Sequence, residues 1–151
     1  MLDRGIKVGL GTDCSGGFSP SILNAVRDAV IASKVVAMSS SASPHTSQTT
    51  LANRTLPLAT LLHLSTLGGA QLCNLSSQIG SLQPGKEFDA ILVSVRNEVG
   101  NGSVWANLEG GEGGMPKDEL PALLEKFFFC ADDRNVRRVW VRGRLVGGVD
   151  K

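Results

Sequence analysis

The segment "KVGLGTDCSGGFSPSILNAVRDAV", residues 7–30, contains an apolar run, an acidic residue, a glycine-rich stretch and a helical pattern, in that order. Residues 6–10 predict a short buried strand, because they are mostly apolar and are bounded by glycines. Ser19 predicts a helix N-cap, with Pro20 at the first helical position and a helix over residues 21–38. A strand, a polar loop and a capped helix together predict half of a β/α repeat.

Asp13 follows the apolar run, and the local pattern leaves two interpretations of it open. In α/β barrels and open α/β sheets, active-site groups gather at the carboxyl ends of the strands. Asp13 therefore fits a catalytic or metal-binding carboxylate. Aspartate is also common in loops, where it accepts hydrogen bonds from nearby N–H groups, so a turn or cap fits equally well.

The composition indicates a soluble globular protein. Of the 151 residues, 42% are hydrophobic and 19% are charged, which is enough for one domain with its own core. The net charge of +1 gives no indication of a nucleic-acid or membrane-surface partner. The apolar runs are too short to span a bilayer, and the N-terminus lacks the apolar core of a signal peptide. Three cysteines without metal-ligand spacing favour a reducing compartment, so a cytoplasmic location is expected.

The rest of the sequence predicts helices first and strands later, from its apolar spacing and its turn residues. The expected elements are a flexible Ser-rich insertion at 39–50, a helix at 57–66 that Gly68-Gly69 ends, a helical turn at 70–75, a strand from residue 79, a turn at Pro84-Gly85, a strand at 88–95, a Gly-rich loop at 97–116, an amphipathic helix at 119–128 and a hairpin around Arg142-Gly143.

The two histidines do not have the spacing of a metal site. His45 lies in the Ser-rich stretch and His63 lies between leucines of a predicted helix. There is no HxH or HExxH pair, so the chain is not expected to build a conventional zinc site by itself. We interpret His45 as a loop residue and His63 as a helix-surface residue.

Several stretches together resemble the metal-dependent amidohydrolases. "VGLGTD" followed by "SGG" is similar to the eighth barrel strand of that superfamily, which an aspartate ends. "LSTLGGAQLCNLSSQIGSLQPGKEFDAILV" resembles its C-terminal signature, and "VRRVWVRGRLV" resembles its closing hairpin. Within the superfamily, "GTDCSGGFSPSILNAVRDAV" and "FFFCADDRNVRRVWVRGR" are most similar to the guanine deaminases.

The resemblance implies an α/β fold, the C-terminal part of a (β/α)8 barrel together with part of a small β-sandwich. Residues 1–75 would supply the last barrel strand and its helices, and residues 76–151 would supply sandwich strands. The interposed helix at 119–128 would pack on the barrel. A whole barrel needs about 250 residues, so the chain is expected to be a truncated C-terminal fragment.

The resemblance also implies hydrolytic deamination of guanine to xanthine and ammonia in a site that holds one zinc ion. By carry-over, Asp13 would be both the catalytic carboxylate and a metal-side residue, while the other zinc ligands would be absent from this chain. The isolated chain would then be inactive, and the complete protein would be a homodimer. Two alternatives stay open, namely a non-catalytic fragment or structural partner of a deaminase protomer, and an amidohydrolase that acts on another aminated heterocycle.

Overall fold

A computed structural model describes residues 1–40, 55–104 and 120–148. The chain separates into two compact units, Met1–Gln83 and Pro84–Lys151. Residues 41–50 of the predicted insertion, His45 among them, and residues 105–116 of the predicted Gly-rich loop lie outside the described ranges. In the part that is described, no helix is both long enough and apolar enough to cross a membrane.

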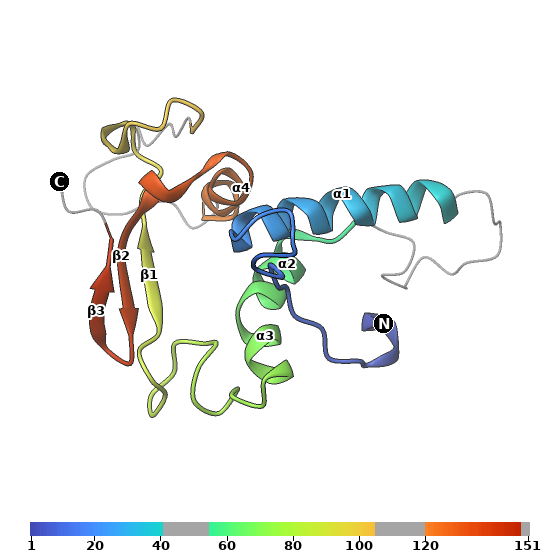
Figure 1. The fold of residues 1–151 in the computed structure, drawn as a ribbon, viewed down its shortest axis with the longest axis horizontal. Helices are drawn as coiled ribbons and strands as arrows, with labels where there is room; N and C mark the ends of the chain where they lie inside the picture. The colour runs from blue at the N-terminus through green and yellow to red at the C-terminus, as the bar shows by residue number, and fades with distance from the viewer. Residues whose placement is uncertain (41–54, 105–119, 149–151) are drawn as a thin grey trace. The chain divides into compact units, whose positions relative to one another are not determined.

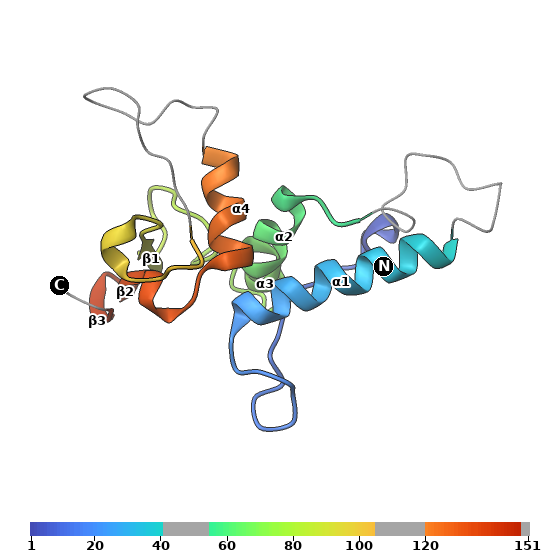
Figure 2. The same ribbon diagram turned by 90° about the horizontal axis from the view of Figure 1, so that it is seen from above.

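The described elements of the first unit are helical. They are the 3-10 helix η1 (Leu2–Arg4) and the α-helices α1 (Ile22–Ser40), α2 (Leu58–Ser65) and α3 (Leu67–Leu72). Helix α2 packs against both α1 and α3 (Figure 1, Figure 2). The predicted helices at 21–38 and 57–66 are thus confirmed, although α1 extends two residues into the predicted insertion.

Helix α1 buries one face, on which its residues recur at helical spacing. Val26 and Val30 are buried, and Ala29 and Ser33 are half-buried. The predicted cap is displaced by two residues, because the helix begins at Ile22 and not at Pro20. Ser19 still receives hydrogen bonds at Oγ, from the backbone N–H of Ser21 and the side-chain amide of Asn24.

The strand predicted at residues 6–10 is wrong, because this segment has no strand partner among the described residues. A β-strand is defined by a ladder of hydrogen bonds to a neighbour. Here the segment is held at its end by one such bond, in which Leu10 N–H donates to the carbonyl of Leu64 at the end of α2 (3.2 Å).

The prediction that Gly68-Gly69 ends a helix is also wrong. Helix α2 ends one turn earlier at Ser65, and both glycines lie inside α3. They allow a close approach of backbones instead: a Cβ atom on Gly68 would lie 3.0 Å from the carbonyl oxygen of Val8, and one on Gly9 would lie 2.9 Å from Cα of Gly69. The glycines therefore let α3 pack directly on residues 6–10, which we call the extended segment.

The second unit contains a three-stranded antiparallel sheet of β1 (Ala90–Val93), β2 (Val136–Val141) and β3 (Arg144–Gly147). Strand β2 lies in the middle (Figure 1). The predicted hairpin is confirmed: Arg142 and Gly143 have φ angles of 52° and 73°, the left-handed pair that joins two twisted strands tightly.

The strand expected from residue 79 is wrong, since no ladder forms there. The N–H groups of Gln78 and Ile79 instead bond back to the carbonyl of Leu75. After β1 come η3 (Asn97–Val99), α4 (Leu120–Cys130) and η5 (Asp133–Asn135). Helix α4 confirms the predicted amphipathic helix and buries Phe127 and Phe128.

Candidate functional site

Asp13 lies on the loop that joins the extended segment to helix α1. Its φ angle is 47°, in the left-handed region that few residues other than glycine adopt. Aspartate is among the side chains that tolerate this region best. The residue is exposed, so its carboxylate faces solvent.

Two glycines fix the backbone of this turn. The N–H groups of Gly16 and Gly17 both donate to the carbonyl oxygen of Asp13. A Cβ atom on Gly17 would collide with the carbonyl oxygen of Thr12, and one on Gly16 would lie 2.9 Å from Oδ2 of Asp13. The tight turn therefore depends on these glycines.

The backbone of Asp13, and not its side chain, caps the turn. Among the described residues, none forms a hydrogen bond or an ion pair with the Asp13 carboxylate. Of the two interpretations left open by the sequence, the side-chain cap is therefore without support in this geometry. The carboxylate is left accessible for a ligand or a reacting group.

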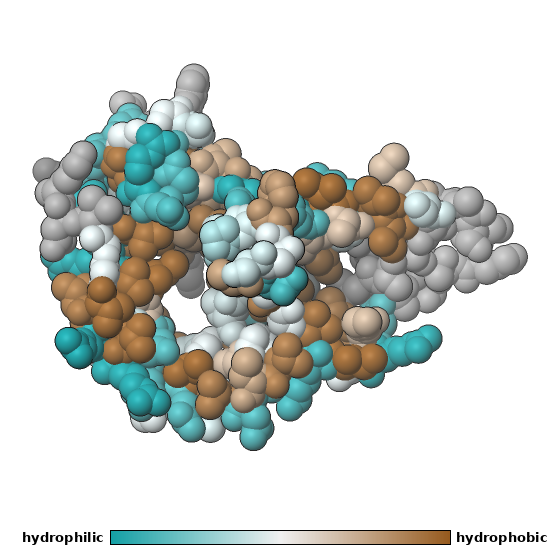
Figure 3. Space-filling view, viewed as in Figure 1, coloured by the Kyte–Doolittle hydropathy of each residue, from teal (hydrophilic) through white to brown (hydrophobic). Residues whose placement is uncertain are grey.

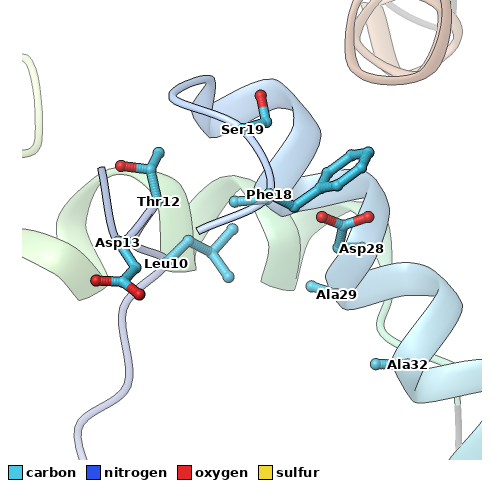
Figure 4. Close-up of a pocket in the computed structure, with 10 residues that line it drawn as sticks. Leu10, Thr12, Asp13, Phe18, Ser19, Asp28, Ala29 and Ala32 are labelled. Atoms are coloured by element: carbon cyan, nitrogen blue, oxygen red, sulfur yellow. The ribbon is translucent and has the colours of Figure 1, made fainter. Parts of the chain in front are cut away.

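A pocket of about 420 Å³ lies beside this turn. The loop lines it with Leu10, Thr12, Asp13 and Phe18, and helix α1 lines it with Asp28 and with the alanines at 25, 29 and 32. In Figure 4 the carboxylates of Asp13 and Asp28 lie on opposite sides of Leu10. The pocket thus combines an apolar floor with two carboxylates, which is the usual make-up of a small-molecule site.

The described residues do not by themselves fit a zinc site. Outside the undescribed stretches, no group of three His, Cys, Asp or Glu side chains lies close enough to hold a metal ion. His63 is exposed on α2 and is not among the residues that line the pocket. Because a catalytic zinc needs three protein ligands, a zinc ion at Asp13 would require donors from beyond this set.

The sequence located Asp13 but missed the rest of the pocket. Phe18, Asp28 and the three alanines become neighbours only through the direction in which α1 leaves the loop. The spacing of the alanines, at 25, 29 and 32, was one usable signal, because residues four and three apart share a helix face. Nothing in the local sequence marks Asp28 as facing the same space as Asp13.

Comparison with known proteins identifies the family. The family model described as "Amidohydrolase family" matches residues 1–146. The chain belongs to the amidohydrolase family. The chain is 38% identical over 150 residues to a probable guanine deaminase of Schizosaccharomyces pombe and 36% identical over 146 residues to the human guanine deaminase. These alignments cover 99% and 97% of this chain, but 25% and 29% of those relatives.

Solved structures of guanine deaminases share the fold of this chain. Guanine deaminase from Bradyrhizobium japonicum matches with a TM-score of 0.73 and 23% identity, over 96% of this chain and 32% of that one. Guanine deaminase from Escherichia coli matches with a TM-score of 0.65 and 25% identity, over 99% and 30%. The predicted resemblance is confirmed, as is a mixed α/β fold that corresponds to part of these larger structures. The chain spans between a quarter and three tenths of the length of the curated relatives named above.

Proposed function

We propose that this chain is part of a guanine deaminase, an enzyme that converts guanine and water to xanthine and ammonia. The observation that carries the proposal is the similarity to guanine deaminases of yeast and mammals, which extends over 97–99% of the chain at 34–38% identity. The similarity includes the loop of Asp13 and the pocket beside it. By the same carry-over, the substrate is a free purine, the protein is cytoplasmic, and the complete enzyme is a homodimer.

In this proposal Asp13 acts first as the general base and then as the general acid. Hydrolysis requires a base that accepts a proton from the attacking water and an acid that returns one to the departing amino group. An accessible carboxylate can do both in sequence, because it is ionised before the attack and protonated after it. The geometry supports this role, since the described residues leave both oxygens of Asp13 without a competing bond.

We also infer that the chain works only when joined to the remainder of the deaminase fold. Ile31, Val35 and Met38 recur on one side of α1, and more than half of each side chain is exposed. Figure 3 shows hydrophobic side chains at the surface over this helix. Exposed apolar rows of this kind are typical of surfaces that other protein covers. The isolated chain is therefore expected to show no turnover.

A chimera tests the proposal. In the Schizosaccharomyces pombe relative, the stretch that matches this chain is exchanged for residues 1–151, and the same exchange in the human relative gives a second host. We expect both chimeras to form xanthine and ammonia from guanine. Replacing Asp13 by asparagine should then lower kcat by about 10³-fold, the range of a lost general base. Asp133→Asn, at an exposed carboxylate in η5, is the control and should leave kcat unchanged.

Three outcomes would contradict the proposal. An Asp13→Asn chimera within about tenfold of its parent would make Asp13 a loop residue. Clear turnover of guanine by the isolated chain with added zinc would show that the remainder of the fold is not needed. A preference for adenosine would favour the alternative stated above, an amidohydrolase that acts on another aminated heterocycle; an adenosine deaminase from Xanthomonas campestris shares the fold, with a TM-score of 0.66 at 22% identity.

A further inference from the structure

Phe18 is the most exposed large apolar side chain in the described part of the protein, with 91% of its surface accessible. A single exposed apolar residue needs no explanation when it stands on an ordinary surface. Phe18 does not, because it lines the same pocket as Asp13 and is five residues from it in the same loop. Its ring is therefore available to a molecule that enters this pocket.

The backbone on both sides of Phe18 is held in place. On one side, Gly17 N–H donates to the carbonyl of Asp13. On the other side, Ser19 Oγ accepts bonds from Ser21 N–H (3.2 Å) and from the amide of Asn24 in helix α1 (2.8 Å). The backbone position of Phe18 relative to Asp13 is thus set by the turn and by the start of α1.

Much of the lining of the pocket is apolar. Ala25, Ala29 and Ala32 lie on one side of α1 and project only methyl groups, and Leu10 adds to the same apolar surface. Figure 4 shows the ring of Phe18 on the side of the pocket formed by α1, close to Asp28 in that view. An aromatic ring and apolar side chains together offer apolar surface to a planar heterocycle, and two carboxylates line the same pocket.

We propose that Phe18 is a substrate-binding residue whose ring stacks on the purine ring of guanine. This inference rests on the proposed function, because the purine is the only planar substrate that function supplies. Stacking covers a ring that otherwise stays in water, and it holds the purine without selecting among its substituents. Phe18 therefore contributes affinity for purines in general, and Asp13 contributes the chemistry.

Kinetics of the chimera described above test the role of Phe18. Phe18→Ala should raise KM for guanine about tenfold, the effect of losing one stacked aromatic ring, with kcat changed much less. Phe18→Tyr keeps the ring and should keep KM near its original value. Phe129→Ala, which removes a partly exposed ring from α4, is the control and should leave both constants unchanged. An unchanged KM in Phe18→Ala, or a drop in kcat alone, would overturn the inference.

Binding provides a readout that does not depend on turnover. Phe18→Trp places a fluorophore at this position, and titration with guanine or xanthine should quench it more than it quenches the unmodified chimera. If the chimera does not deaminate guanine but this quenching occurs, the proposed function fails and purine stacking stands. If the chimera deaminates guanine through Asp13 and no additional quenching occurs, the proposed function stands and the role of Phe18 is wrong. If the chimera neither deaminates guanine nor shows the additional quenching, both the proposed function and the role of Phe18 are wrong.

Discussion

Two irregular segments of the backbone are held by hydrogen bonds of different kinds. One is the loop of Asp13 in the first unit, and the other is the segment around Asn135 in the second unit. In the loop, glycine N–H groups bond to a backbone carbonyl, and the side chains of Asp13 and Phe18 stay exposed. Around Asn135, buried side-chain amides make the bonds. Asn135 Oδ1 accepts from the amide of Asn101 (2.8 Å) and from Asp132 N–H (3.0 Å), and its own amide donates to the carbonyl of Ser94 (2.7 Å).

The difference separates side chains that stay accessible from side chains that hold the backbone. A loop that is fixed by backbone bonds and by glycine leaves its side-chain atoms open to a ligand. A buried amide has the opposite constraint, because it is costly unless every polar atom finds a partner. No buried side-chain N or O atom of the described residues lacks a partner.

The largest expected effect comes from Asn135→Ala. The residue is fully buried, and its loss leaves Asn101, Asp132 and Ser94 each without one hydrogen-bond partner. We expect the free energy of unfolding of the chain to fall by about 3 kcal/mol, measured by urea denaturation. Asn97→Ala removes an exposed amide and serves as the control, with little expected change. If the two variants are equally stable, the buried amide of Asn135 is not what holds this segment.

A smaller effect is expected from Gly17→Ala. The added Cβ would meet the carbonyl of Thr12, so the turn must open to relieve the collision. We expect a loss of about 1–2 kcal/mol in unfolding free energy. Gly11→Ala in the same loop has open space around the new methyl group and should be neutral or slightly stabilising. If the alanine at position 17 is tolerated as well as that at 11, glycine is not what fixes the loop.

The smallest effect is expected from Arg134→Gln, at the surface of the second unit. Arg134 donates to the Asp132 carboxylate (2.7 Å) and to the carbonyl of Gly100 (2.8 Å), but both partners of the ion pair are exposed. Exposed ion pairs add little to stability. The urea midpoint should therefore stay unchanged in low and in moderate salt.

The pH dependence of this pair has a definite sign. The hydrogen bond with Asp132 is the main cause that raises the pKa of Arg134 above its ordinary value. Because the pKa of Arg134 is higher in the folded chain than in the unfolded chain, the pair adds its full stability at any pH below the pKa that Arg134 has in the unfolded chain. That stability is lost only when the pH rises through the pKa that Arg134 has in the folded chain. Both values lie far above neutral pH, so the parent chain and the Arg134→Gln variant should show the same pH profile of stability between about pH 6 and pH 9. A difference confined to that window would contradict the assignment.

The sequence predicted well what depends on local spacing. The apolar period predicted α1 and α4, and Arg142-Gly143 predicted the hairpin, because a helix face and a tight turn are encoded by neighbouring residues. The strand at residues 6–10 was predicted wrongly, since a ladder depends on a partner that local sequence does not specify. Gly68-Gly69 was misinterpreted for a similar reason: its role is set by Val8 and Gly9, far away in the sequence.

For the site, the loop position of Asp13 could be predicted, but the pocket could not. The apolar run followed by an acid and glycines placed Asp13 in a loop and left open whether its carboxylate is catalytic or metal-binding or caps a turn. That Phe18 and Asp28 line the same pocket depends on the path of the chain from Gly17 into α1, which spacing alone does not give. The catalytic and metal-side roles of Asp13 stay predictions from the family.

The contact between residues 6–10 and α3 determines which substitutions this part of the sequence can accept. The contact is made by backbone atoms, and it excludes a side chain at Gly9 and at Gly68. Lys7 is exposed, and a methyl group on Gly69 would meet only ordinary van der Waals contact, at 3.7 Å from the carbonyl of Leu64. Substitutions at residues 7 and 69 are therefore expected to leave this contact intact, whereas any side chain at residue 9 or 68 is expected to separate the two backbones.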